Sequence, residues 1–183
     1  ILESLARLLL PSAQAMVSGL LPVADGTQVD LMRVNDAGTV DAVIATTTTS
    51  GGRYSFDLTA FNVGFSSDLM VLVSGFGVEM RAFVTNESID IDPVAEAVSR
   101  LIFETIAGTQ GSLLSHFTVA EIYLLHSSVN LLTSLRGSAT QSDVDSTVNA
   151  VTTLLKSHSS ITGFLAAAVS PGQTSANLGD VEN

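Results

Sequence analysis

The chain has 183 residues, which is enough for one ordinary domain or for a small domain with an appendage. Its 18 acidic and 7 basic residues give a net charge of -11, which excludes binding to a nucleic-acid backbone, because that needs a basic face. The absence of cysteine excludes disulfides, cysteine-based zinc sites and thiol nucleophiles, and a hydrophobic share of 46% excludes a disordered acidic tail.

Residues 1–13 form an apolar segment that has two interpretations. Leu2 to Leu10 fits a short amphipathic helix that docks on the domain. Residues 8–15 also resemble the end of a secretory signal, with small residues at Ala13 and Ala15, although a basic start is missing. The uninterrupted apolar part is far shorter than the roughly 20 residues of a membrane span, so no transmembrane helix is predicted.

Seven short strands are predicted between residues 14 and 91. Val29 and Leu31 alternate with polar neighbours, and Tyr54, Phe56 and Leu58 do the same, which is the period of a half-buried strand. Turn residues separate the strands at spacings typical of an antiparallel sandwich. The expected strands are 15–20, 27–34, 39–49, 53–58, 68–76, 78–85 and 88–91.

The hydrophobic period changes to that of a helix at Asp92 and Pro93. Asp92 is a good N-cap, and Pro93 suits the first helical position. Thr118 and Glu121 have the spacing of a capping box at the start of a second helix. Helices are expected at about 93–108, 118–136, 142–158 and 161–169.

The sequence therefore predicts the α+β class. Its parts are the segment 1–13, a seven-stranded antiparallel β-sandwich over 14–91, a bundle of three to four helices over 92–172, and a tail over 173–183.

The strand half resembles a bacterial carboxypeptidase regulatory-like domain, a transthyretin-like β-sandwich. The residues that carry the resemblance are Val17-Ser18-Gly19, Pro22 to Leu31, and Ala45 to Phe56 with its Gly52-Arg53-Tyr54-Ser55-Phe56 hairpin. The resemblance covers residues 14–91 and implies a non-catalytic module for surface display, adhesion, assembly or binding. It supplies no catalytic residues.

Few residues have the spacing of a chemical site. The histidines lack an i,i+4 pair, and the acidic residues near 90 do not match a calcium-binding loop. We therefore predict that the protein is not an enzyme and that it has no metal site and no cofactor. The residues considered are His116, His126, His158, Glu87, Asp90 and Asp92.

The low charge is the least ordinary feature of the chain. Charged residues make up 14%, against a usual share of about 25%. The helical half also has more apolar residues than one buried stripe per helix requires. Either these residues fill a core shared with the sandwich, or they form an exposed patch that contacts another subunit. The apolar residues that lie beside the stripes are Leu113, Leu114, Phe117, Tyr123, Leu124, Leu131, Leu154 and Phe164.

We favour the second interpretation, which predicts a structural protein that self-associates as a homo-oligomer or polymer. Its Ser/Thr-rich, lysine-poor composition is typical of a secreted or cell-surface protein. Contact is expected at Leu2, Leu5, Leu9 and Leu10, the residues that the sandwich explains least. The alternative is a secreted binding module for a carbohydrate or a protein partner.

Overall fold

The computed structural model describes residues 16–20, 24–75, 77–132 and 141–169. Six strands precede one 3₁₀ helix and four α-helices within these residues, which confirms the α+β class. The elements are β1 (Met16–Leu20), β2 (Gln28–Val34), β3 (Val40–Thr48), β4 (Arg53–Asp57), β5 (Leu69–Gly75), β6 (Val78–Phe83), α2 (Pro93–Gly108), η1 (Leu114–His116), α3 (Val119–Leu132), α4 (Gln141–Ser157) and α5 (Ser159–Ala168).

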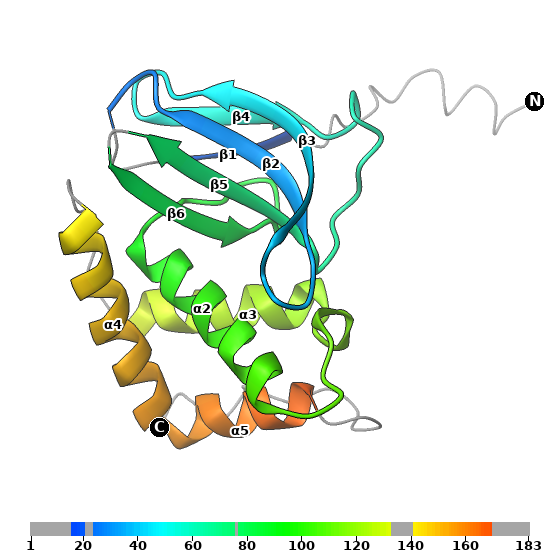
Figure 1. Cartoon of the computed structure of the whole chain (residues 1–183), viewed down its shortest axis with the longest axis vertical. Coiled ribbons are helices and arrows are strands. Elements are labelled where there is room, and N and C mark those ends of the chain that lie inside the picture. Colours follow the sequence, from blue (N-terminus) through cyan, green and yellow to red (C-terminus); the bar gives the residue numbers. More distant parts are fainter. Residues whose placement is uncertain (1–15, 21–23, 76, 133–140, 170–183) are drawn as a thin grey trace, which may run out of the picture.

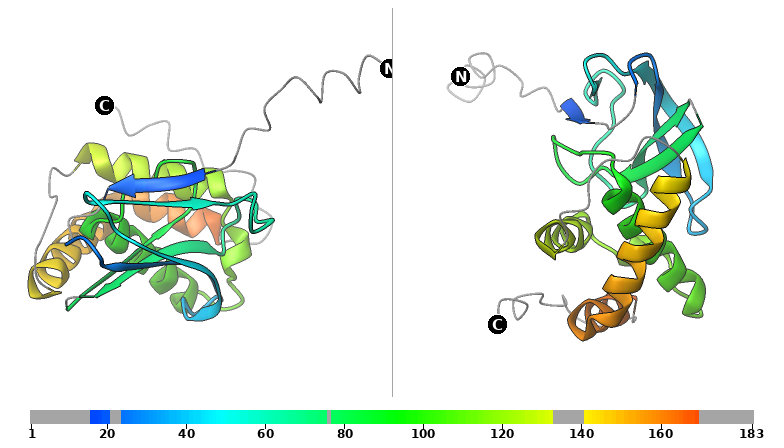
Figure 2. Two further views of the ribbon diagram at one scale, coloured as in Figure 1. Left: turned by 90° about the horizontal axis from the view of Figure 1, so that it is seen from above. Right: turned by 90° about the vertical axis from the view of Figure 1, so that its left-hand side faces the viewer.

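The strands form two antiparallel sheets. One has four strands in the order β3-β2-β5-β6, and the other is the pair β1-β4. Figure 1 shows the strands at one end of the molecule and the helices at the other. In both views of Figure 2, β1 lies on the opposite side of the strand layer from β2 and β3. The protein is therefore a small sandwich of unequal sheets, joined to helices.

The prediction of seven strands is wrong, because residues 88–91 are not a strand in the structure. Ile89 and Ile91 are nevertheless buried, and the Tyr54 hydroxyl donates to the Ile89 carbonyl at 2.6 Å. The alternation at 88–91 therefore indicates burial of the two isoleucine side chains in a segment that has a single β-bridge, at Ser88, and no strand. The other six predicted strands are confirmed, with ends that differ by a few residues.

The transition from strands to helices lies at Asp92, as predicted. The Asp92 carboxylate accepts from the amides of Val94 at 2.9 Å and Ala95 at 2.8 Å, which caps α2. The predicted capping box is also present: the Glu121 amide donates to Thr118 Oγ1 at 3.2 Å, and the Thr118 amide donates to Glu121 Oε2 at 2.8 Å. Both caps are local signals, so they could be recognised in the sequence.

Three predictions lie outside the described residues: the segment 1–13, the tail 173–183 and the end of the second helix at Arg136. The predicted helices at 142–158 and 161–169 correspond to α4 and α5.

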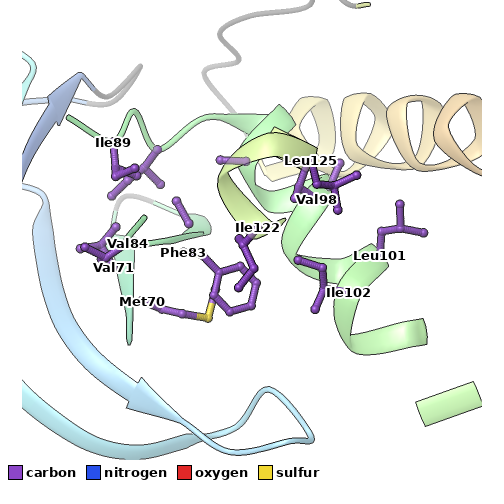
Figure 3. Packing of buried hydrophobic residues seen from close by; sticks show 14 of the residues in the cluster. Met70, Val71, Phe83, Val84, Ile89, Val98, Leu101, Ile102, Ile122 and Leu125 are labelled. Carbon is purple, nitrogen blue, oxygen red and sulfur yellow. The ribbon is translucent and has the colours of Figure 1, made fainter. Parts of the chain in front are cut away.

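One continuous hydrophobic core extends from the sandwich into the helices. In Figure 3, side chains of β5 and β6 point toward side chains of α2 and α3. The apolar residues beside the helical stripes divide between buried and exposed positions, and their contact with another subunit stays a prediction. Leu114, Phe117 and Phe164 are buried in the shared core. Leu113, Tyr123, Leu124 and Leu154 are exposed.

Candidate functional site

Strand β3 lies at one edge of the four-stranded sheet and is largely exposed. Five of the seven residues of its neighbour β2 are buried, whereas none of the nine residues of β3 is buried. Ile44 and Ala45 are partly buried and pack against the edge of the core, whereas most other residues of β3 are exposed. Val40 is 48% exposed and Val43 is 56% exposed, which is unusual for valines in a strand.

The outer backbone edge of β3 has no partner among the described residues, where β3 pairs with β2 alone. The Thr49 amide donates to the Thr27 carbonyl at 2.9 Å, and hydrogen bonding alternates along an antiparallel strand. The amide and carbonyl groups of Thr46 and Thr48 therefore point away from β2. This is the kind of edge to which another strand can add.

The edge strand is irregular at two places. Leu31 pairs with Ala45 and Met32 pairs with Val43, so Ile44 is an extra residue, and a second register shift follows near Asp41. Such bulges bend an edge strand and restrict the length over which it can pair. The regular part of the edge is Ala45 to Thr48.

A polar cleft of about 700 Å³ lies at the opposite edge of the four-stranded sheet from β3, where β6 meets the helices. Its charged and amide side chains come from three elements: Glu79 and Arg81 from β6, Glu96 and Arg100 from α2, and Gln141 from α4. Gly75 and Gly77 form the rim at the turn between β5 and β6.

Glu96 and the two arginines of this cleft are paired with one another. The Glu96 side chain is only 5% exposed and accepts from Arg100 Nε at 2.7 Å and from the Arg81 amide at 2.9 Å. Arg81 Nε lies 3.4 Å from the same carboxylate. Arg100 Nη2 also reaches Asp145 at 3.2 Å, and Gln141 donates to Asp145 at 2.9 Å. We call these residues the Glu96 cluster; it joins β6, α2 and α4.

The pKa of Arg100 reflects this arrangement. Partial burial acts to lower it, but hydrogen bonds and charge from Glu96 and Asp145 outweigh burial and raise the pKa of Arg100. Glu96 and Asp145 therefore stabilise the charged form of Arg100.

A second ion pair joins two strands at the far end of the sheet and makes stability depend on pH. Arg33 Nη1 lies 2.7 Å from Asp68, and both side chains are 37% exposed. Partial burial acts to raise the pKa of Asp68, but hydrogen bonds from Ser66 and Arg33 and the charge of Arg33 outweigh it and lower the pKa.

We therefore expect the stabilisation from Asp68 to be complete above the usual carboxyl pKa of about 4 and to be lost as pH falls through the lower pKa of the folded state. Melting temperatures of the unmodified chain and of Asp68→Asn should differ slightly at pH 6 and converge toward pH 3. The corresponding difference in the free energy of unfolding is small, about 1 kcal/mol or less, because both side chains of the ion pair are partly exposed to solvent. A difference that stays constant over this range would contradict the assignment.

Two of the residues considered for metal binding, His116 and Asp92, have structural roles. His116 Nδ1 accepts from the Leu113 amide at 3.3 Å, and His158 immediately follows α4. Asp92 caps α2. The described part of the chain has no group of three or more histidine or acidic residues that could hold a metal ion. The predicted contact residues Leu2, Leu5, Leu9 and Leu10 lie outside the described residues.

Neither the β3 edge nor the Glu96 cluster was predicted from the sequence. Glu96 and Arg100 have the i,i+4 spacing of a helical ion pair, so part of the cluster could have been recognised. Arg81 and Asp145 are far from them in the chain and could not. A run rich in β-branched residues such as β3 does not reveal whether the strand is central or at an edge.

Comparisons with protein-family models, with curated proteins and with solved structures found no match for this chain. The likeness to carboxypeptidase regulatory-like domains therefore stays a prediction. Among the described helices, none combines the length and the apolar character needed to cross a membrane.

Proposed function

We propose that this protein is a non-catalytic structural module that associates with copies of itself, as a secreted or cell-surface subunit of an oligomer or filament. The observation that carries the proposal is β3, an edge strand whose nine residues are all at least partly exposed. A single ionised side chain, Asp41, occurs among them.

Charge is the second argument. Each copy has a net charge of -11, so two copies repel one another. A stable contact must use surfaces with few carboxylates, and β3 is such a surface. The exposed Tyr123 and Leu124 of α3 provide a further apolar area that a neighbour could cover.

Sedimentation of the full chain tests the proposal. We expect self-association to strengthen as ionic strength rises from about 0.01 M to about 1 M, because the Debye length shrinks from about 30 Å to about 3 Å and screens the repulsion. Deletion of Ile1 to Pro11 should weaken association, because this segment contains the predicted contact residues Leu2, Leu5, Leu9 and Leu10.

Self-association and the role of the N-terminal segment in it can be contradicted by different results. A full chain that stays monomeric at every concentration and salt level contradicts self-association. A truncated chain that assembles as well as the full chain removes the N-terminal segment from the contact and leaves the proposal intact.

A binding module for a carbohydrate is the second candidate, favoured by the polar cleft. Both arginines of the cleft are already paired with Glu96, so an anion gains little there. Hydroxyl groups of a sugar could bond to the side-chain amide of Gln141 and to Arg81 and Arg100. A monomeric chain that binds neutral oligosaccharides would favour this candidate over self-association.

A further inference from the structure

We infer that the β3 edge is the contact itself: β3 of one copy pairs in antiparallel orientation with β3 of a second copy, around a two-fold axis at Thr47. This inference rests on the proposed function and names the surface through which it acts. It joins the two four-stranded sheets into one continuous sheet.

The backbone groups fit this pairing. In an antiparallel pair centred on Thr47, residue 46 of one strand faces residue 48 of the other. Thr46 and Thr48 are the residues whose amide and carbonyl groups point away from β2, so both pairs can exchange hydrogen bonds. The two Thr47 residues then meet as a non-hydrogen-bonded pair, in which the Cα atoms are about 4.5 Å apart.

The side chains of this region also suit a second copy. The regular part of the edge, Ala45 to Thr48, consists of one alanine and three threonines, and facing threonines form favourable cross-strand pairs. No carboxylate occurs in these four residues, so the pairing brings no acidic groups directly opposite each other in spite of the net charge.

The only carboxylate of β3 lies outside the paired residues. Asp41 precedes the extra residue Ile44, whereas the regular edge is Ala45 to Thr48. Two copies that pair over these four residues therefore meet where β3 has no charged side chain, although each copy has a net charge of -11. The outward backbone groups are also symmetric about Thr47, so a second copy satisfies the same groups on both strands, which favours a second copy as the partner.

A single introduced cysteine tests the two-fold axis. The chain has no cysteine, so every disulfide formed by Thr47→Cys joins two copies. Cα atoms about 4.5 Å apart are within the range that a disulfide can bridge. The control is Ser160→Cys, at an exposed position of α5 far from β3 in the chain.

We expect oxidation to convert most of the Thr47→Cys chain to a covalent dimer. At the same protein concentration, the Ser160→Cys chain should form little covalent dimer. Similar yields from the two variants would show random collision and overturn the inference. A Thr47→Cys chain that assembles in sedimentation but does not cross-link would overturn it as well.

A second pair of variants tests the outward amide of Thr48 as a hydrogen-bond donor at the edge. Thr48→Pro deletes the outward amide of Thr48 and leaves the bonds between β3 and β2 in place, whereas Thr48→Val keeps the amide and the branched shape. We expect Thr48→Pro to lose self-association and Thr48→Val to keep it. If Thr48→Pro does not fold, as judged by circular dichroism, the cross-linking result decides.

The results with Thr48→Pro and with the unmodified chain distinguish a failure of the inferred β3 pairing from a failure of the proposed function. A full chain that assembles equally well with Thr48→Pro associates through another surface, so the inference is wrong and the proposed function stands. A full chain that is monomeric under all conditions contradicts the proposed function directly.

Discussion

Replacing Glu96 by Gln is expected to lower the free energy of unfolding by about 2 to 3 kcal/mol. The same change at Glu104, on the same helix, should cost less than about 1 kcal/mol. Both glutamates form an ion pair with a basic side chain at 2.6 to 2.7 Å, but Glu96 is buried and also accepts from the Arg81 amide, so the comparison measures burial together with these extra partners.

Burial differs strongly between these two pairs. The Glu96 side chain is 5% exposed, whereas Glu104 and its partner Lys156 are 51% and 52% exposed. Removing one charge from a buried pair leaves the partner without compensation, which typically costs 3 to 5 kcal/mol. Arg81 and Arg100 retain some access to water, so the expected cost lies below that range.

Urea unfolding, followed by circular dichroism, measures both variants. An effect of Glu96→Gln no larger than that of Glu104→Gln would show that the Glu96 cluster does not hold β6, α2 and α4 together. The result bears on function too, because the cluster fixes the shape of the polar cleft.

Gly38→Ala is expected to lower the free energy of unfolding by about 2 to 4 kcal/mol. Gly38 has a φ of 72°, and an added Cβ would lie 2.9 Å from Cγ of Phe103. The left-handed backbone costs an L-residue about 1 to 2 kcal/mol, and overpacking of a filled core costs about 1 to 3 kcal/mol.

Phe103 has little freedom to move aside. Its ring lies 5.5 Å from the ring of Phe83, and the Arg81 guanidinium lies 5.1 Å from its centre on a cation–π contact. Arg81 also donates to the Gly38 carbonyl at 3.0 Å, so the turn after β2 is tied to the helices at this point. The substitution therefore tests whether this turn holds the two halves of the molecule together.

Gly51→Ala is the matched control. Gly51 has a φ of 60°, but no atom lies within 4 Å of an added Cβ. We expect a cost of about 1 to 2 kcal/mol, from the backbone alone. Equal costs for the two alanine variants, measured by urea unfolding, would mean that Phe103 repacks freely and that the turn is not held by it.

Local signals in the sequence account for much of the fold. The helix start at Asp92 and the capping box at Thr118 use side chains that bond to amides two or three residues away, so no distant contact is needed to recognise them. The alternation in β2 and β4 likewise depends on neighbouring residues only.

The sequence by itself therefore determined the class, six of the strands, and the point where strands give way to helices. The tertiary structure decided which strands share a sheet, that Ile89 and Ile91 are buried although residues 88–91 form no strand, and that β3 is left at an open edge. It also decided that Arg81 and Asp145 meet Glu96 and Arg100, although they are far apart in the chain. The physical reason is that a period or a cap reports on a residue's immediate neighbours, whereas edges, paired charges and exposed apolar side chains depend on which distant segments cover them.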